Sequence, residues 1–241
     1  MCERIWMIIL AIPALLSVPG NPVGAYEEAP VEKGGSISGT IFFDGAPPVR
    51  KPLNVKPPCE NQKALSEDLI VNKSSDGAKN VIANTVVSIV AIARGKPFVK
   101  EAPVLDQKGC VFVPHIVVVP AGLKLSVLNS DAMAHNIHTD TDVNKESNST
   151  MQPNEKSSLK YDEPDHVAVH CDLHPWMKAW IVVAANPYFQ ITGEDGTFKI
   201  QNVSAGTYSI SFWHETLGEQ KKQITVKAGD DSRIECNFKG K

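Results

Sequence analysis

The chain has 241 residues, 42% of them hydrophobic and 21% charged, which is the composition of an ordinary globular protein. This length allows one large domain or two small ones. The formal net charge of -3 is small and no run of basic residues stands out, so neither nucleic acid nor an acidic membrane surface is an expected partner.

Residues 1–25 have the pattern of a secretion signal. Arg4 precedes the apolar run Ile5–Ile12, and Val23–Ala25 offers small residues for cleavage. The apolar run is short for a membrane span, although an uncleaved membrane anchor is the alternative interpretation. We therefore expect an exported protein, periplasmic or extracellular, with no transmembrane segment in the mature chain.

Downstream, short runs rich in Val, Ile, Phe and Tyr recur between Gly, Pro, Asn and Asp, a pattern typical of an all-β sandwich or barrel. The polar segment Asn144–Ser158 is expected to be a solvated loop, and Lys51–Lys79 a long loop or a cap. The expected strands are, in chain order, Ser36–Phe43, Thr85–Ala93, His115–Val119, Lys124–Leu128, Val167–His170, Ala179–Ala184, Thr197–Gln201, Tyr208–Trp213 and Gln223–Lys227.

The stretch His170–Met177 carries the most informative chemistry. It places the thiolate of Cys171, the imidazole of His174 and the thioether of Met177 within seven residues, so these groups converge only if the loop wraps around one point. Thiolate and thioether are soft ligands suited to Cu(I), and imidazole suits both oxidation states of copper. One more imidazole completes the blue-copper set, and His135 upstream is the candidate.

Two separated motifs resemble the cupredoxin family. The pattern N-x-D-x-x-x-H-N at Asn129–Asn136 is followed by C-x-x-H-x-x-M at Cys171–Met177, a ligand loop most similar to that of amicyanins and plastocyanins. The segment Phe112–Gly122 also resembles a strand pair of small cupredoxins. The resemblance covers roughly residues 105–185.

The resemblance implies a Greek-key β-sandwich that holds one type 1 copper ion. By this resemblance His135, Cys171 and His174 are the equatorial ligands and Met177 is the axial ligand. Asn136 would brace the site by pointing its backbone N–H at the thiolate sulfur. Zinc is the alternative metal, but a thioether is a poor Zn²⁺ ligand.

The remaining histidines are weaker candidates. His138 and His170 lie an odd number of residues from the nearest ligands, so on strands they should point to the opposite face, as surface or supporting residues. His115, His166 and His214 have no clustering partner in the sequence and are expected to be ordinary exposed histidines.

Apolar residues near the expected ligands suggest a docking rim. Met133, Pro175 and Trp176 would surround the edge of the metal centre, where redox partner proteins would bind, since exposed apolar patches often mark docking surfaces. The alternative is that Trp176 is buried between loops. The sequence names no particular partner.

The other cysteines are expected to have structural roles. Cys110 stands just before the first cupredoxin-like strand and Cys59 lies in the Pro-containing cap, so a disulfide between them would tie the cap to the sandwich. Cys236 would then be an odd thiol on the last strand, buried as a small hydrophobic residue.

The C-terminal region resembles a second family. Gln190–Tyr208 carries the T-x-x-D-G-x-F…G-x-Y pattern of carboxypeptidase regulatory-like, transthyretin-like sandwiches, which implies a structural module. The opening strands of such a module look like Ser36–Phe42 and Thr85–Ile92, so the cupredoxin would be inserted into it; alternatively these are extra cupredoxin strands. The expected division is 1–25 signal peptide, 34–102 N-terminal strands and cap, 103–187 cupredoxin, and 188–241 second sandwich.

The expected function is that of an exported copper protein that carries single electrons. The alternatives are a copper storage or delivery protein, and an adhesion or scaffold protein with a secondary metal site. No enzyme is expected, because the sequence shows neither a second copper cluster of the multicopper oxidase or nitrite reductase kind nor a Ser/His/Asp arrangement with supporting motifs.

Overall fold

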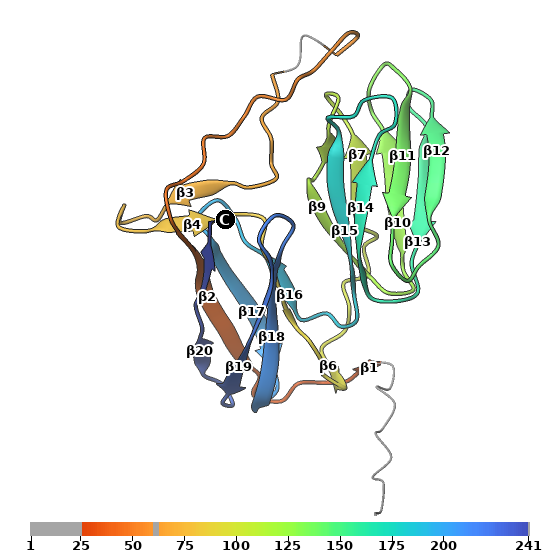
Figure 1. The fold of residues 1–241 in the computed structure, drawn as a ribbon. Helices are drawn as coiled ribbons and strands as arrows, with labels where there is room; N and C mark the ends of the chain where they lie inside the picture. Colours follow the sequence, from red (N-terminus) through yellow and green to blue (C-terminus); the bar gives the residue numbers. More distant parts are fainter. Residues whose placement is uncertain (1–25, 60–62, 241) are drawn as a thin grey trace, which may run out of the picture.

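The computed structural model describes residues 26–59 and 63–240, so the expected signal peptide lies outside the described residues. The regular secondary structure of these residues consists of β-strands alone, which confirms the expected all-β class. The described residues contain no helix long and apolar enough to cross a membrane. Figure 1 shows two sandwiches side by side, one coloured green to cyan and the other mostly brown and blue.

The first sandwich is built from one contiguous stretch of chain. Along β10 every second side chain is buried, and Leu125 and Val127 meet Ile137, Val167 and Ile181 of the facing sheet in one apolar core. One sheet has the order β13 (Lys156–Lys160), β10 (Lys124–Asn129), β7 (Val104–Gln107) and β8 (Phe112–Val113). The other has the order β12 (Ser147–Met151), β11 (His135–Asp140), β14 (Asp165–His170), β15 (Lys178–Ala184) and β9 (Ile116–Pro120).

The second sandwich combines strands from both ends of the described chain. Its core gathers Ile37 and Ile41 from the N-terminal part with Ile200, Phe212 and Phe238 from the C-terminal part. One sheet has the order β16 (Phe189–Ile191), β5 (Val86–Ile89), β18 (Gly206–His214) and β19 (Gly218–Val226). The other has the order β17 (Thr197–Val203), β2 (Gly35–Asp44), β4 (Asn80–Ile82) and β3 (Val71–Lys73). Two further strands, β20 (Asp231–Arg233) and β21 (Cys236–Lys239), also pair with β2. A separate two-stranded sheet joins β1 (Glu27–Glu28) to β6 (Arg94–Gly95).

The two sandwiches meet through an apolar interface. All five residues of β9 are buried, because Val117 and Val119 face the first core while Ile116 and Val118 face the neighbouring sandwich. The second sandwich contributes Val86 and the partly buried residues Phe189, Ile191 and Trp213 to this contact. A strand covered on both faces carries a continuous apolar run rather than an alternating one, which explains the sequence of β9.

Some expected elements differ from the structure. The segment Asn144–Ser158 was expected to be a solvated loop, but it contains β12 and the start of β13. Both strands lie at sheet edges and most of their side chains are exposed, so they lack the apolar alternation that marks a half-buried strand. The strand expected over Thr85–Ala93 is shorter and spans Val86–Ile89.

Strands far apart in the sequence share the sheets of the second sandwich. β2 pairs with β17, β20 and β21, and β5 pairs with β16 and β18. Strands from residues 34–102 and 188–241 therefore form common sheets. The division into folding units stays a prediction, and a deletion experiment described below tests it.

Candidate metal centre

The ligand loop connects two neighbouring strands of the first sandwich. β14 ends at His170, Cys171 follows directly, and β15 begins at Lys178. Backbone hydrogen bonds close the loop on itself: the N–H of Cys171 donates to the carbonyl of Met177 at 3.3 Å, and the N–H of Met177 donates to the carbonyl of His174 at 2.8 Å. The loop is therefore tight enough to bring its side chains around one point.

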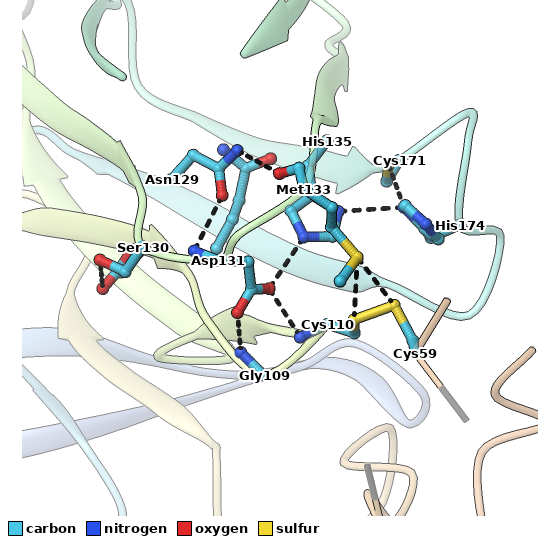
Figure 2. Close-up of polar contacts among 12 residues, drawn as sticks. Cys59, Gly109, Cys110, Asn129, Ser130, Asp131, Met133, His135, Cys171 and His174 are labelled. Carbon is cyan, nitrogen blue, oxygen red and sulfur yellow. Dashed lines mark hydrogen bonds and ion pairs between the residues drawn. A yellow bond between two sulfur atoms is a disulfide. The ribbon is translucent and has the colours of Figure 1, made fainter. Parts of the chain in front are cut away.

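Three candidate ligands converge in the structure. Nδ1 of His135, at the start of β11, lies 3.0 Å from Nδ1 of His174, which lies 3.6 Å from Sγ of Cys171 (Figure 2). The three donor atoms all lie within 4.8 Å of one another. Their residues are 0%, 6% and 1% exposed, respectively. Burial, followed by the charge of His135, lowers the pKa of His174, which favours the neutral imidazole that binds metals.

Met177 and Asn136 lie where they can support this cluster. Met177 is fully buried in the same apolar core as Cys171. The backbone N–H of Asn136 donates to Sγ of Cys171 at 3.2 Å, and its side-chain carbonyl accepts from the N–H of Asp172 at 3.2 Å. Asn136 thus ties β11 to the ligand loop and places a donor against the sulfur. A donor in this position stabilises negative charge on a thiolate.

Asp131 holds the ring of His135, a role that the sequence interpretation did not assign. Its carboxylate lies 2.8 Å from Nε2 of His135 and accepts from the backbone N–H groups of Gly109 and Cys110 (Figure 2). If Nε2 carries the proton that this contact requires, Nδ1 presents its lone pair to His174 and Cys171. Asp131 belongs to the N-x-D part of the upstream motif, and its position four residues before His135 was the available signal.

A disulfide lies against the rim of the cluster. Cys59 and Cys110 are joined, with their Cα atoms 6.1 Å apart, and this bond links the cap to the first sandwich. The thioether sulfur of Met133 lies 3.5 Å from Sγ of Cys59 and 3.7 Å from Sγ of Cys110 (Figure 2). Met133 is therefore half-buried beside the disulfide rather than fully free on the surface.

The other expected rim residues differ in exposure. Pro175 is exposed, and so is Leu173 of the same loop at 55%, whereas Trp176 is half-buried. The indole N–H of Trp176 donates to the carbonyl of Cys110 at 3.1 Å, and its ring lies edge-on to that of His174 with centroids 5.2 Å apart. Trp176 is therefore neither a fully exposed residue of the docking rim nor completely buried between loops.

Two histidines expected to be exposed are buried. His115 lies in the interface between the sandwiches, where its ring contacts the carboxylate of Glu215. Burial lowers the pKa of His115, but the hydrogen bond and charge of Glu215 outweigh this effect and leave the pKa raised. Burial, followed by the charge of His115, lowers the pKa of His214 to about 4. The expectation failed because tertiary contacts cover both rings: His115 meets Glu215, a hundred residues later in the chain, and His214 packs beside Phe238 in the second sandwich.

His138 and His170 face away from the buried cluster, as strand alternation predicts, but they are not isolated. The two residues lie opposite each other on β11 and β14, and their ring centroids are 4.3 Å apart. The sequence interpretation treated them separately because the pairing of these strands was not known. His166 is exposed on β14 and stacks on Trp213 of the second sandwich.

Two family models match the chain in segments that overlap at residues 180–184. Residues 100–184 match the family described as copper binding proteins, plastocyanin/azurin family. Residues 180–234 match polysaccharide lyase family 4, domain II, which partly supports the second module expected from the sequence. A comparison with curated protein sequences gave no match.

Several solved structures are similar to part of the chain. An oxidised amicyanin variant is 27% identical, with 36% of this chain and 85% of that chain covered and a TM-score of 0.32. A purple cupredoxin from Nitrosopumilus maritimus is 20% identical, with coverages of 34% and 99% and a TM-score of 0.30. The copper-containing nitrite reductase from Thermus scotoductus is 20% identical with a TM-score of 0.34; the match covers 40% of this chain but only 25% of the reductase.

Proposed function

We propose that residues 100–184, a domain of the plastocyanin/azurin family of copper-binding proteins, hold one type 1 copper ion and pass single electrons as an exported carrier. The observation that carries the proposal is the buried convergence of His135 Nδ1, His174 Nδ1 and Cys171 Sγ. Two imidazoles and a thiolate, with the buried Met177 of the same loop as a further soft donor, form the set that suits copper in both oxidation states. When bound, copper would supply the one-electron redox couple.

The residues around the site would hold the ligands in a constant geometry. The backbone N–H of Asn136 stabilises charge on the sulfur of Cys171, and Asp131 fixes the ring of His135. The ligand loop is pinned between two paired strands by its own backbone hydrogen bonds. Ligands that barely move favour fast electron transfer, and their burial favours retention of the metal over delivery.

Electrons would enter and leave on the side of His174. This ring is the most exposed of the three buried ligands and contacts Trp176. Leu173 and Pro175 project from the same loop and are exposed, so they would form the apolar surface for a redox partner protein. The role is that of a carrier rather than an enzyme.

Export is supported by the disulfide between Cys59 and Cys110. Structural disulfides persist in oxidising compartments, such as the bacterial periplasm or the extracellular space, and are rare where thiols are kept reduced. Together with the N-terminal signal pattern, this pairing favours a protein that works outside the cytoplasm. Peptide mapping under non-reducing conditions tests the pairing, and a fragment that joins Cys59 to Cys236 would contradict it.

The proposal is tested by loading copper into the chain that lacks residues 1–25. We expect one copper per chain by metal analysis, and a colour that disappears on reduction and returns on oxidation, with a reversible one-electron wave in voltammetry. His135→Asn should abolish the wave, whereas the control His166→Asn, which removes an exposed imidazole from β14, should keep it. A colourless protein that prefers zinc over copper would overturn the proposal.

Met177 would supply a further, weak thioether ligand to the metal, and its replacement tests that role. We expect Met177→Leu to keep one copper and most of the colour, because the two imidazoles and the thiolate remain. The reduction potential should rise, since loss of the thioether donor disfavours Cu(II). Met151→Leu, a change at another buried methionine of the same core, should leave the potential unchanged. Equal potentials in all three proteins would exclude Met177 from the metal.

A further inference from the structure

A second group of metal-binding side chains lies on the outer face of the sheet that carries the copper site. His138 of β11 and His170 of β14 are paired across the strands, and Asp172 follows in the ligand loop. Alternation along the strands turns these imidazoles away from the buried cluster. The proposed copper site therefore does not use them.

The donor atoms of this group converge on one carboxylate oxygen. Nδ1 of His138 lies 2.9 Å from Oδ1 of Asp172, and Nε2 of His170 lies 3.3 Å from the same oxygen. Zn–N and Zn–O bonds of about 2.0–2.2 Å at tetrahedral angles place ligand atoms roughly 3.3–3.5 Å apart. The two N···O distances are thus close to the spacing of ligands around one small cation, and all three atoms lie within 4.8 Å of one another.

Neighbouring groups hold two of these side chains in a binding orientation. Oδ2 of Asp140 lies 3.1 Å from Nδ1 of His170, so a proton on Nδ1 leaves the lone pair of Nε2 facing Asp172. The side-chain amide of Asn148 donates to Oδ2 of Asp172 at 3.0 Å, which leaves Oδ1 for the histidines. Carboxylate and amide partners behind the ligands are the usual second layer of protein metal sites.

The charge of the group is not balanced by basic side chains. Among the described residues, neither Asp140 nor Asp172 forms an ion pair with a lysine or arginine. In the metal-free protein a proton shared between Nδ1 of His138 and Oδ1 of Asp172 makes their hydrogen bond, and a cation held by the same atoms would replace that proton.

Solvent and ions have access to the group. The side chains of His138, His170 and Asp172 are 29%, 33% and 45% exposed. Asp140, His170 and Asp172 also line a cleft of about 640 Å³, together with Asp68 and Glu215. The cleft leaves room for a water or a small ligand beside a bound ion.

We propose that His138, His170 and Asp172 bind a divalent cation of the Zn²⁺ type, with Asp140 and Asn148 holding two of the ligands in place. Two imidazoles, one carboxylate and an open position form a donor set that Zn²⁺ accepts. The site is separate from the copper centre around Cys171, and the inference does not depend on that centre being a type 1 site.

The test is a calorimetric titration of Zn²⁺ into the chain that lacks residues 1–25, which keeps every residue described in the structure. The matched variants are His138→Asn with His170→Asn, and the control His166→Asn, which removes an imidazole from the same face of β14. We expect the double variant to bind one Zn²⁺ fewer per chain than the wild type, and the control to bind the same number. Asp140→Asn should weaken Zn²⁺ binding at this site by about 10–100-fold.

This design separates the second site from the first. Zn²⁺ entering the buried cluster adds one equivalent to all three proteins, so the difference between wild type and double variant is unaffected. Equal Zn²⁺ stoichiometry and affinity in the wild type and the double variant would overturn the proposal, as would a wild type that takes up no Zn²⁺. The colour of the copper-loaded double variant reports on the copper site alone, so either proposal can fail while the other stands.

Discussion

Each sandwich contains one buried cysteine that forms no disulfide, and the two have different surroundings. Cys171 in the first sandwich and Cys236 in the second are both free and buried among the described residues. Sγ of Cys171 accepts the backbone N–H of Asn136 and lies beside the ring of His174. Sγ of Cys236 instead donates to the side-chain carbonyl of Gln220 at 3.4 Å.

The difference shows that burial alone does not make a cysteine a metal ligand. Burial raises the pKa of the Cys236 thiol, so this sulfur stays protonated and behaves as a small core residue. Cys171 is equally buried, but an N–H donor and two imidazoles surround it, a set of groups that could hold a cation together with the sulfur. The partners of the sulfur therefore decide its chemistry.

The largest expected effect comes from removing the first sandwich. Deleting residues 103–187, joining the ends with a short Gly/Ser linker and changing the unpaired Cys59 to Ser leaves all strands of the second sandwich in place. We expect a β protein that unfolds cooperatively, as followed by circular dichroism, because β2 and β5 keep their C-terminal partners.

The complementary fragment, residues 26–187, lacks the C-terminal partners of β2 and β5. If it folds and binds copper while the deletion protein is unfolded, the N-terminal strands belong to the cupredoxin. The two cysteines would then not lie in two independently folding sandwiches.

A smaller effect is expected from removing the disulfide. Cys59 and Cys110 are separated by 51 residues, so changing both to Ser should lower the free energy of unfolding by about 2–4 kcal/mol, because the unfolded chain regains the freedom of that loop. Urea unfolding of the metal-free protein measures this loss. Cys236→Ser is the control for cysteine replacement, and the copper colour should persist in both proteins.

An unchanged unfolding midpoint in the double serine variant would show that the disulfide does not stabilise the fold. Loss of the copper colour would show instead that the cap shapes the copper site. In that case the environment of Cys171 depends on more than its own loop and strands.

A comparable or smaller effect is expected from acid, acting on the second sandwich. The pKa of buried His214 is about 4, below the unfolded value of about 6.5, so its contribution to stability is present above pH 6.5 and is lost as pH falls toward 4. The loss over this window is at most roughly 3 kcal/mol. His214→Asn keeps an acceptor for the backbone N–H of Thr216 and should remove this pH dependence.

Urea unfolding of the wild type and His214→Asn at pH 7 and pH 4.5 measures the effect. His115 has a raised pKa and acts in the opposite direction, so the comparison is made between the two proteins at each pH rather than from one protein's profile. Equal losses of stability in both proteins would contradict the assignment.

The sequence was sufficient to predict the all-β class and the segment matched by the copper-binding family, because both depend on local patterns. It was insufficient where neighbours from distant segments decide the outcome. The pairing of His138 with His170 depends on the register of β11 with β14, and the burial of His115 depends on a second sandwich. The edge strands β12 and β13 bury too few side chains to leave an alternating pattern.

The contrast between the two buried cysteines is tested most directly by the visible absorption spectrum of two copper-loaded variants. Cys171→Ser should lose the charge-transfer colour completely, because the thiolate that gives rise to it is gone. Cys236→Ser should keep the colour and bind one copper per chain, since its sulfur lies in the other core. Colour that survives in Cys171→Ser, or that disappears in Cys236→Ser, would contradict the assignment of copper to His135, Cys171 and His174.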